Sequence, residues 1–457
     1  MITGNLLILI FIASLLSLFF LILFLKWDAF IALLVVATLT GIVVGIPIVD
    51  VPVIIADGFG STLAGVGILI GLGIVLGKLM EFSGAIQKIA STLLNISGPK
   101  KSRHAVASTG LVVGIPLFFD AAFVILNNLV RSLSAKAKIP YVSLVLPLAL
   151  GLIVAYCIVI PTPAPLAVAD NLSLDLGLFF IYGLIVALGA IYVGGIVYGK
   201  FVGRNAKPLI ENAINNLASE QESQHEISAS TESRKEISAG LAFFVILLPI
   251  ALILLNTIFG LVMPETAAAA FFGFVGEKNM ALLISVIVAA YLLKPYMKKD
   301  IGEAYTESFK SAGLIILITG AGGGFGSIVN ETGIGDYLVS TMQNWNMPII
   351  LLAFLFAQML RVALGSSTVS LITTSSILGP MALSLGVSPI LLGLAICAGG
   401  IGLSMPNDSG FWVVSKFAGL SVVDTLKTWS FGGFIAGVTG LVIVYILSLG
   451  SGFLPGI

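Results

Sequence analysis

The sequence predicts an all-α polytopic membrane protein built from two inverted repeats. Three observations point to this fold class. The 457 residues are 58% hydrophobic and only 10% charged, the mean hydropathy is +1.13, and apolar runs recur along almost the whole chain. Soluble domains are about 45–50% apolar and about 25% charged. A chain with so few charges excludes a cytosolic enzyme, a nucleic-acid binder and a disordered protein.

The apolar runs have the length of membrane spans, since about 20 helical residues cross roughly 30 Å of hydrocarbon. The first run, residues 4–25, follows no basic residue and is longer than a signal-peptide core, so we expect it to be retained. Further runs lie at residues 29–49, 60–80, 105–130, 140–160, 177–199, 239–262, 279–293, 311–330, 348–386, 388–404 and 430–449. We expect about five spanning helices and one re-entrant helical hairpin in each half.

One long polar stretch divides the chain. Residues 204–238 are rich in Glu, Ser and Gln, a composition typical of a solvated linker. We therefore expect a first repeat at residues 1–203, a polar cytoplasmic linker at 204–238 and a second repeat at 239–457.

Positive charges predict the first hairpin. Basic residues collect on the cytoplasmic side of membrane proteins, and basic clusters at residues 78–103 and 131–138 flank the apolar run 105–130. A single crossing would place one cluster outside, whereas a re-entrant hairpin keeps both inside. Break signals occur at Gly114 with Pro116 and at Asn127-Asn128.

The second half contains a similar segment. Residues 348–386 are too long for one span and are interrupted at Gly365-Ser366-Ser367. A hairpin here places both termini outside. Of the 22 Lys and Arg residues, 20 then lie on the cytoplasmic side, with Lys278 outside and Arg361 within the membrane.

The two halves resemble one another. With an offset of 249 residues, Gly71, Gly73, Gly77 and Gly84 align with Gly320, Gly322, Gly326 and Gly333. Each half continues with a hairpin and an interrupted helix, near 156–171 at Pro161 and near 401–412 at Pro406. An odd number of spans inverts the second half, as in many transporters that bind substrate where interrupted helices meet.

Three charges lie inside apolar segments, where insertion scales assign each a cost of about 2.5–3.5 kcal/mol. They are Asp120, Arg361 and Asp408. In a structural interpretation, Arg361 pairs with Asp120 or Asp408. In a functional one, Arg361 binds a substrate carboxylate and Asp120 or Asp408 takes up the coupling proton. Both can hold in different transport states.

Small polar residues near the breaks complete the predicted site. A helix start at a hairpin tip exposes N–H groups and a positive dipole end, which suit an anion. These residues could also simply satisfy neighbouring backbone groups. The predicted substrate-binding residues are Arg361, Gly365, Ser366, Ser367, Thr368, Asn407, Ser409, Thr162, Gly114 and Pro116.

The sequence offers no metal or cofactor site. The two histidines, His104 and His225, lie at a predicted helix start and in the linker, so neither suits an intramembrane proton relay. The two cysteines lie in apolar stretches with no metal-ligand spacing. The sequence contains no Gly-x-Ser-x-Gly motif, which would indicate a hydrolase. For the glycine-rich span 320–326 we expect close helix packing, with a broken helix that lines a cavity as the alternative.

Several motifs resemble the gluconate permease (gluconate:proton symporter) family of the ion transporter superfamily. They are Gly58-Phe-Gly-Ser-Thr62, Gly114-Ile-Pro-Leu-Phe-Phe-Asp120, Arg361-Val-Ala-Leu-Gly-Ser-Ser-Thr368, Asn407-Asp-Ser-Gly-Phe-Trp412, Gly419-Leu-Ser421 and Thr425-Leu-Lys-Thr-Trp429. The resemblance implies a multi-pass protein of the bacterial inner membrane that imports small hydroxy or sugar acids such as gluconate with protons. It also implies a homodimer and elevator-type movement, and no cofactor.

Two positions depart from the family pattern. The family usually has Pro-Pro-His-Pro-Gly-Pro where this chain has Pro161-Thr-Pro-Ala-Pro165, and His-Val where it has Met405-Pro406. The missing histidines leave the substrate and the coupling ion open. The alternatives are a Na⁺-coupled carboxylate symporter and an anion exchanger of the same fold, with an intramembrane enzyme or a channel less favoured.

Overall fold

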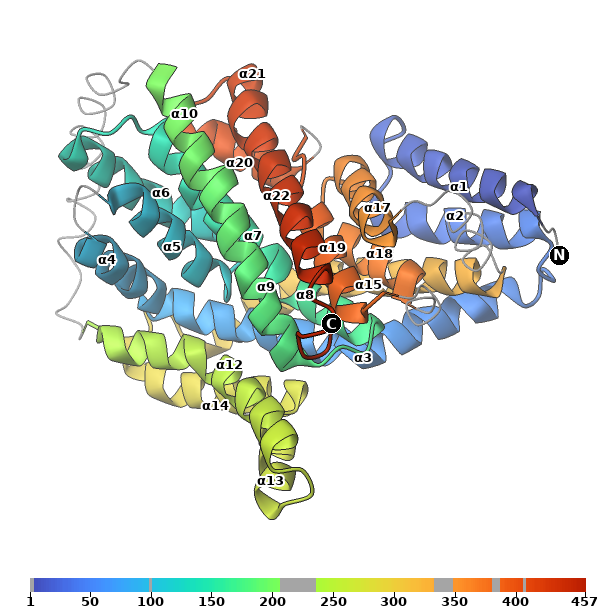
Figure 1. Cartoon of the computed structure of the whole chain (residues 1–457), viewed down its shortest axis with the longest axis horizontal. Coiled ribbons are helices and arrows are strands. Elements are labelled where there is room, and N and C mark those ends of the chain that lie inside the picture. Colours follow the sequence, from blue (N-terminus) through green and yellow to red (C-terminus); the bar gives the residue numbers. More distant parts are fainter. Residues whose placement is uncertain (1–3, 98–100, 206–235, 333–347, 380–386, 406–407) are drawn as a thin grey trace.

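Apolar runs in a membrane fold as helices because each backbone N–H and C=O must find its partner within the protein. The computed structural model describes residues 4–97, 101–205, 236–332, 348–379, 387–405 and 408–457, and all regular secondary structure in these ranges is helical (Figure 1). The first half contains α1 (Asn5–Leu23), α2 (Ala29–Val44), α3 (Val51–Phe82), α4 (Ala85–Ser97), α5 (Ser102–Gly114), α6 (Phe119–Ala137), α7 (Val142–Ile158), α8 (Pro163–Asn171), α9 (Leu176–Ala190), η2 (Ile191–Val197) and α10 (Tyr198–Asn205). The second contains α12 (Ala239–Val262), α13 (Ala267–Val275), α14 (Lys278–Leu293), η3 (Lys294–Tyr296), α15 (Ile301–Glu331), α17 (Ile349–Leu364), α18 (Ser367–Leu378), α19 (Pro389–Ile401), α20 (Ser409–Ala418), α21 (Val422–Thr425), η5 (Leu426–Ser430) and α22 (Phe431–Ser448).

Several of the described helices could cross a membrane. Within the described ranges six helices are long and apolar enough to cross a bilayer, and a seventh candidate is α3, which bends by 45° between Gly65 and Gly67. Shorter apolar helices, among them α17, α18 and α19, accompany them. Many apolar side chains face outward, for example Leu9, Leu188 and Ile287, each at least 54% exposed. Outward apolar surface of this kind fits contact with lipid.

Two long helices form the centre of the molecule. Helices α3 and α15 pack antiparallel through glycines, with Gly323 against Thr62 and the Gly58 carbonyl, and Gly320 against Phe59. This arrangement agrees with the close packing expected for the span 320–326, which forms part of continuous α15. In addition, α2 packs on α15, α14 packs on α3, and α1 and α12 cover α2 and α14 (Figure 1).

Each half contains a pair of helices joined by a tight break. Helix α5 ends at Gly114 and α6 begins at Phe119, so the first break lies at the Gly114–Pro116 signal. The prediction of a second break at Asn127-Asn128 was wrong, because α6 continues through these residues to Ala137. Asn127 is buried and satisfied inside this helix: its amide donates to the Phe417 carbonyl at 3.0 Å, and its oxygen accepts from Tyr141.

The second pair is α17 and α18, which break at Gly365 and Ser366. Gly365 has φ 65°, a left-handed conformation that favours glycine, and its N–H donates to the Arg361 carbonyl at 3.1 Å. Ser366 caps α18 by accepting from the Val369 N–H at 3.4 Å. The end of the predicted hairpin, residues 380–386, lies outside the described residues.

Two further helices are interrupted. The chain leaves the helical conformation between α7 and α8, at residues 159–162, and between α19 and α20, at residues 402–405 and 408. In the polar stretch between the halves, α10 extends to Asn205 and α12 begins at Ala239, and residues 206–235 lie outside the described part of the chain.

Candidate functional site

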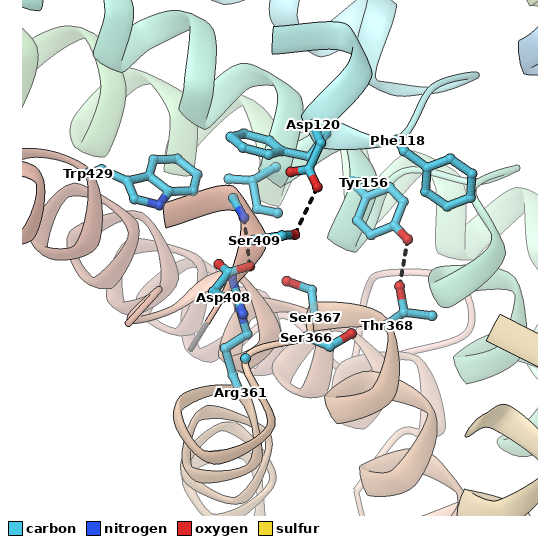
Figure 2. Close-up of a pocket in the computed structure, with 14 residues that line it drawn as sticks. Phe118, Asp120, Tyr156, Arg361, Ser366, Ser367, Thr368, Asp408, Ser409 and Trp429 are labelled. Atoms are coloured by element: carbon cyan, nitrogen blue, oxygen red, sulfur yellow. Dashed lines mark hydrogen bonds and ion pairs between the residues drawn. The ribbon is translucent and has the colours of Figure 1, made fainter. Parts of the chain in front are cut away.

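A polar cavity lies where the breaks meet. It has a volume of about 170 Å³, and its walls come from α6, α7, the α17–α18 break, the start of α20 and η5 (Figure 2). The lining residues are Phe118, Phe119, Asp120, Ile153, Tyr156, Arg361, Gly365, Ser366, Ser367, Thr368, Asp408, Ser409, Gly410 and Trp429. A cavity of this size suits a small ligand.

Three helices begin at this cavity. The first residues of α6, α18 and α20 are Phe119, Ser367 and Ser409, and all three line it. The N-terminus of a helix presents free N–H groups and carries a partial positive charge of roughly half an elementary charge. Convergence of three such ends makes the cavity favourable for anionic groups.

Arg361 supplies a full positive charge. It lies in the last turn of α17 and is 2% exposed. Its Nη2 lies 2.5 Å from Oδ2 of Asp408, whose side chain is 8% exposed. Ser404 also donates to this oxygen, and the other oxygen of Asp408 caps α20 by accepting from the Gly410 N–H at 3.0 Å. This geometry is that of a buried ion pair between the end of α17 and the start of α20.

Arg361 has further hydrogen-bond donors besides the nitrogen that meets Asp408. Its Nε and Nη1 are buried without a hydrogen-bond partner among the described residues, and the indole Nε1 of Trp429 is in the same situation. Unpaired buried donors are costly, about 1–3 kcal/mol each and more for charged groups. Both side chains line the cavity, so these donors are suited to a ligand that accepts hydrogen bonds.

The opposite wall carries a second carboxylate and a tyrosine. Ser409 donates to Asp120 at 2.8 Å, and the hydroxyls of Tyr156 and Thr368 lie 2.6 Å apart (Figure 2). Asp120 stands in the first turn of α6, where the helix dipole favours a negative charge. The Tyr156–Thr368 bond joins α7 of the first half to α18 of the second.

Eight of the twelve predicted site residues line the cavity. They are Asp120, Arg361, Gly365, Ser366, Ser367, Thr368, Asp408 and Ser409. Three others lie elsewhere. Thr162 donates to the Val159 carbonyl at 2.6 Å and so closes its own helix break. Gly114 packs against α7, and Pro116 packs against Gly77 of α3. The twelfth, Asn407, lies outside the described residues.

Sequence reasoning missed the aromatic wall. Phe118, Phe119, Tyr156 and Trp429 line the cavity, and the rings of Phe119 and Trp429 stack with centroids 5.0 Å apart. In an apolar sequence, an aromatic residue is expected in the protein core or on the surface that faces lipid, and not in a binding site. The available signals were adjacency to Asp120 for the two phenylalanines and, for Trp429, its place in one of the family-like motifs.

A metal centre finds no support in this part of the molecule. Among the residues that the structure describes, no group of three or more His, Cys, Asp and Glu could hold a metal ion. Cys157 and Cys397 are both buried and free.

A helical bundle with interrupted helices, a buried charged cavity and an apolar exterior defines a multi-pass membrane transporter. Comparison with known proteins identifies the family. Residues 6–450 match the model described as GntP family permease, so the chain belongs to this family. The protein is a membrane permease and not an enzyme.

Similar proteins cover nearly the whole chain. A high-affinity gluconate transporter of Escherichia coli K12 is 33% identical over 93% of this chain and 95% of its own. A gluconate permease of Pseudomonas aeruginosa is 35% identical over 93% of both chains. The inner membrane permease YgbN of E. coli K12 is 31% identical over 95% of this chain and 96% of its own.

A solved structure shares the fold. The YdaH transporter of Alcanivorax borkumensis, whose crystal structure is described as having an unusual topology, superposes with a TM-score of 0.63. The alignment covers 88% of this chain and 89% of that protein at 15% sequence identity.

Proposed function

We propose that this protein is a secondary active transporter that imports gluconate or a closely related hydroxy acid together with protons. The observation that carries this proposal is the convergence of three helix N-termini and the buried Arg361 on one cavity. Similarity to proteins named gluconate transporters adds the substrate class.

In this proposal Arg361 binds the carboxylate of the substrate. Its Nε and Nη1 have no partner, and once Asp408 no longer holds Nη2, Nε and Nη2 can donate two parallel hydrogen bonds, the geometry in which guanidinium groups bind carboxylates. The polyol chain then extends through the rest of the cavity. There, Ser366, Ser367 and Ser409 offer hydroxyls, and Trp429 offers its N–H.

Coupling follows from competition for Arg361. Without substrate, Asp408 is the partner of Arg361. A substrate carboxylate that draws the guanidinium away leaves Asp408 buried without its counter-ion, and an uncompensated buried charge is costly. Asp408 therefore takes up one proton as the anion binds and releases it when the anion leaves. Asp120 is the second candidate for this role, since it lines the same cavity.

We also propose that the two halves are inverted repeats. Helices α3 (51–82) and α15 (301–331) start 250 residues apart and end 249 apart, close to the offset of the glycine pattern. The packing partners correspond as well: α8 packs on α18 and α20 on α6, while α14 packs on α3 and α2 on α15. These correspondences support a pseudo-twofold arrangement of two similar halves.

An elevator-type movement fits this arrangement. The frame would consist of α1–α3 and α12–α15, and the moving part of the two hairpins and the interrupted helices around the cavity. Contacts between the two parts include the ion pair of Asp170 on α8 with Lys278 on α14.

We further propose a homodimer. The outlying helix α13 is suited to the interface, because none of its residues is buried and Phe271 and Phe274 are about 60% exposed (Figure 1).

The test is uptake of radiolabelled gluconate by proteoliposomes with an inward pH gradient, in competition with glycerate, D-serine, lactate and citrate. Proton-driven accumulation that unlabelled gluconate suppresses most strongly would support the proposal. Accumulation that requires sodium, or loading with an internal anion, would support a sodium symporter or an exchanger. Absence of uptake and of competition would contradict the substrate class.

A further inference from the structure

A second cavity lies away from the substrate site, on the outer surface between α5 and the α9–η2 segment. Its volume is about 340 Å³, and its lining is mostly apolar. The lining residues are His104, Ala107, Ser108, Leu111, Leu188, Ile191, Tyr192 and Ile196. Leu188 and Tyr192 are each 54% exposed, so the cavity is a groove in the surface that faces the bilayer.

Two parallel stripes of side chains form this groove. On α5 they are His104, Ser108 and Leu111, and on α9 and η2 they are Leu188, Tyr192 and Ile196. The rings of His104 and Tyr192 lie 6.4 Å apart, which places the polar tips of the two stripes at the same level. Residues three or four apart share one helix face, so Lys200 continues the second stripe, and Lys101 directly precedes α5 at the end of the first stripe that His104 occupies. Both lysines are exposed.

The two lysines lie at the same end of the groove. Arg103 of α5 donates to the Ser143 hydroxyl at 2.7 Å, and Gly203 of α10 packs against the same serine. The start of α5 and the end of α10 therefore meet beside Ser143. This is the end that the distribution of positive charge assigns to the cytoplasm.

The helices that form the groove carry charge of one sign. The helices α5, α9, η2 and α10 contain Arg103, His104, Lys200 and Arg204, with Lys101 just before α5, and they contain no Asp or Glu. An apolar groove of membrane depth that ends in clustered basic residues is complementary to a lipid with a negative headgroup. The Tyr192 ring at the boundary is typical of an interfacial anchor.

We propose that this groove binds an anionic phospholipid. An acyl chain lies between Leu111 and Leu188, and the phosphate meets Lys101, His104 and Lys200. This site is separate from the substrate cavity, so the inference does not depend on which anion the protein transports.

Native mass spectrometry of the purified protein with equimolar palmitoyl-oleoyl phosphatidylglycerol and phosphatidylcholine tests the proposal. The wild-type protein should retain phosphatidylglycerol preferentially. Each surface lysine contributes about fivefold to the affinity for anionic lipid, so Lys101→Gln with Lys200→Gln should weaken binding about 25-fold. The matched control, Lys26→Gln with Lys294→Gln, removes two exposed lysines elsewhere and should leave binding unchanged. Equal retention of both lipids, or equal loss in both double variants, would overturn the proposal.

A labelling experiment on the wild-type protein removes any dependence on variant folding. Phosphatidylglycerol with a photoreactive diazirine in one acyl chain should label peptides that contain residues 104–111 and 188–196 above all others. The phosphatidylcholine analogue should label these peptides no more than other lipid-facing helices. Uniform labelling by both lipids would show that the groove has no preference and would contradict the site.

Discussion

Arg361 is the residue on which the account depends most. A buried guanidinium with one carboxylate partner and two unpaired nitrogens is incompletely satisfied. Proteins tolerate such an arrangement mostly where a ligand completes it. The same pair also joins α17 to the start of α20, so the proposed mechanism gives Arg361 a structural role in the empty state and a binding role in the loaded one.

Replacement of Arg361 by Gln should reduce gluconate uptake about 100-fold or more, because two charge-assisted hydrogen bonds of about 1.5–3 kcal/mol each are lost. Arg361→Lys should rescue little, since an ammonium group cannot donate in the bidentate geometry. Initial uptake rates in proteoliposomes measure this effect.

Two further variants separate binding from folding in that experiment. Arg361→Gln alone leaves Asp408 buried without its counter-ion, and breaking a buried ion pair in this way destabilises a protein by about 3–5 kcal/mol. The double variant Arg361→Gln with Asp408→Asn removes both charges, so it should recover the yield of folded protein but not uptake. Arg131→Gln is the matched control, because Arg131 bonds the Phe417 carbonyl outside the cavity. Full uptake by the folded double variant would mean that Arg361 is only structural.

Trp429 offers a second test of the binding site, because its unpaired indole N–H also lines the cavity. Trp429→Phe keeps an aromatic ring to stack on Phe119 but removes the unpaired N–H. If the N–H meets a substrate hydroxyl, the KM for gluconate should rise about three- to tenfold with little change in thermal stability. Trp27→Phe, at an exposed position between α1 and α2, should change neither quantity. An unchanged KM in Trp429→Phe would exclude the indole from the binding site.

At the scale of helices, the breaks and the glycine packing determine where the site forms. Gly365 and Ser366 end one helix and start the next, and Asp408 caps α20, so the same residues that shape the backbone also bring charge to the cavity. Behind them, α3 and α15 approach so closely that side chains larger than hydrogen do not fit at several positions.

Gly323→Ala should therefore destabilise the protein. A Cβ at this position would lie 2.7 Å from the Gly58 carbonyl oxygen and closer still to Thr62, and overpacking of this kind costs about 1–3 kcal/mol. Gly313→Ala on the same helix is the matched control, because a Cβ there meets nothing within 4 Å. Thermal unfolding of the purified variants measures the difference. Equal midpoints would contradict the tight packing of α3 against α15.

Much of this organisation was accessible from the sequence, because Gly, Pro and charge in apolar segments have strong local consequences. The breaks at Gly114–Pro116 and Gly365 and the polar set around Arg361 follow from such signals. Asn127 misled because a buried amide can be satisfied by a distant carbonyl, here that of Phe417, without ending its helix. Thr162 misled because its hydroxyl turns back to its own backbone. Tyr156 was missed because a helix buried on all sides has no periodicity that marks its cavity face.

At the scale of the whole molecule, the proposed mechanism requires the part around the cavity to move against the frame. Among the contacts of helix α8 with the frame, the Asp170 carboxylate lies against Gly65 of α3 and pairs with Lys278 of α14. Helices α3 and α15 would move together, since both belong to the frame. The two kinds of contact should respond differently to cross-linking.

A disulfide between Gly65→Cys and Asp170→Cys, in a background with Cys157→Ala and Cys397→Ala, should stop uptake on oxidation, and dithiothreitol should restore it. The matched pair Gly58→Cys and Ser327→Cys joins α3 to α15 within the frame. Its oxidation should leave uptake intact. Continued transport by the fully cross-linked Gly65–Asp170 variant would contradict movement of α8 along α3.

The most direct test of the central claim is a measurement of proton entry driven by gluconate. Proteoliposomes loaded with pyranine, with equal pH on both sides and no sodium, receive external gluconate. The account predicts acidification of the lumen that depends on gluconate, is absent with Arg361→Gln, and is lost in Asp408→Asn or Asp120→Asn, whichever residue carries the proton. Gluconate entry without acidification in the wild-type protein would contradict proton coupling.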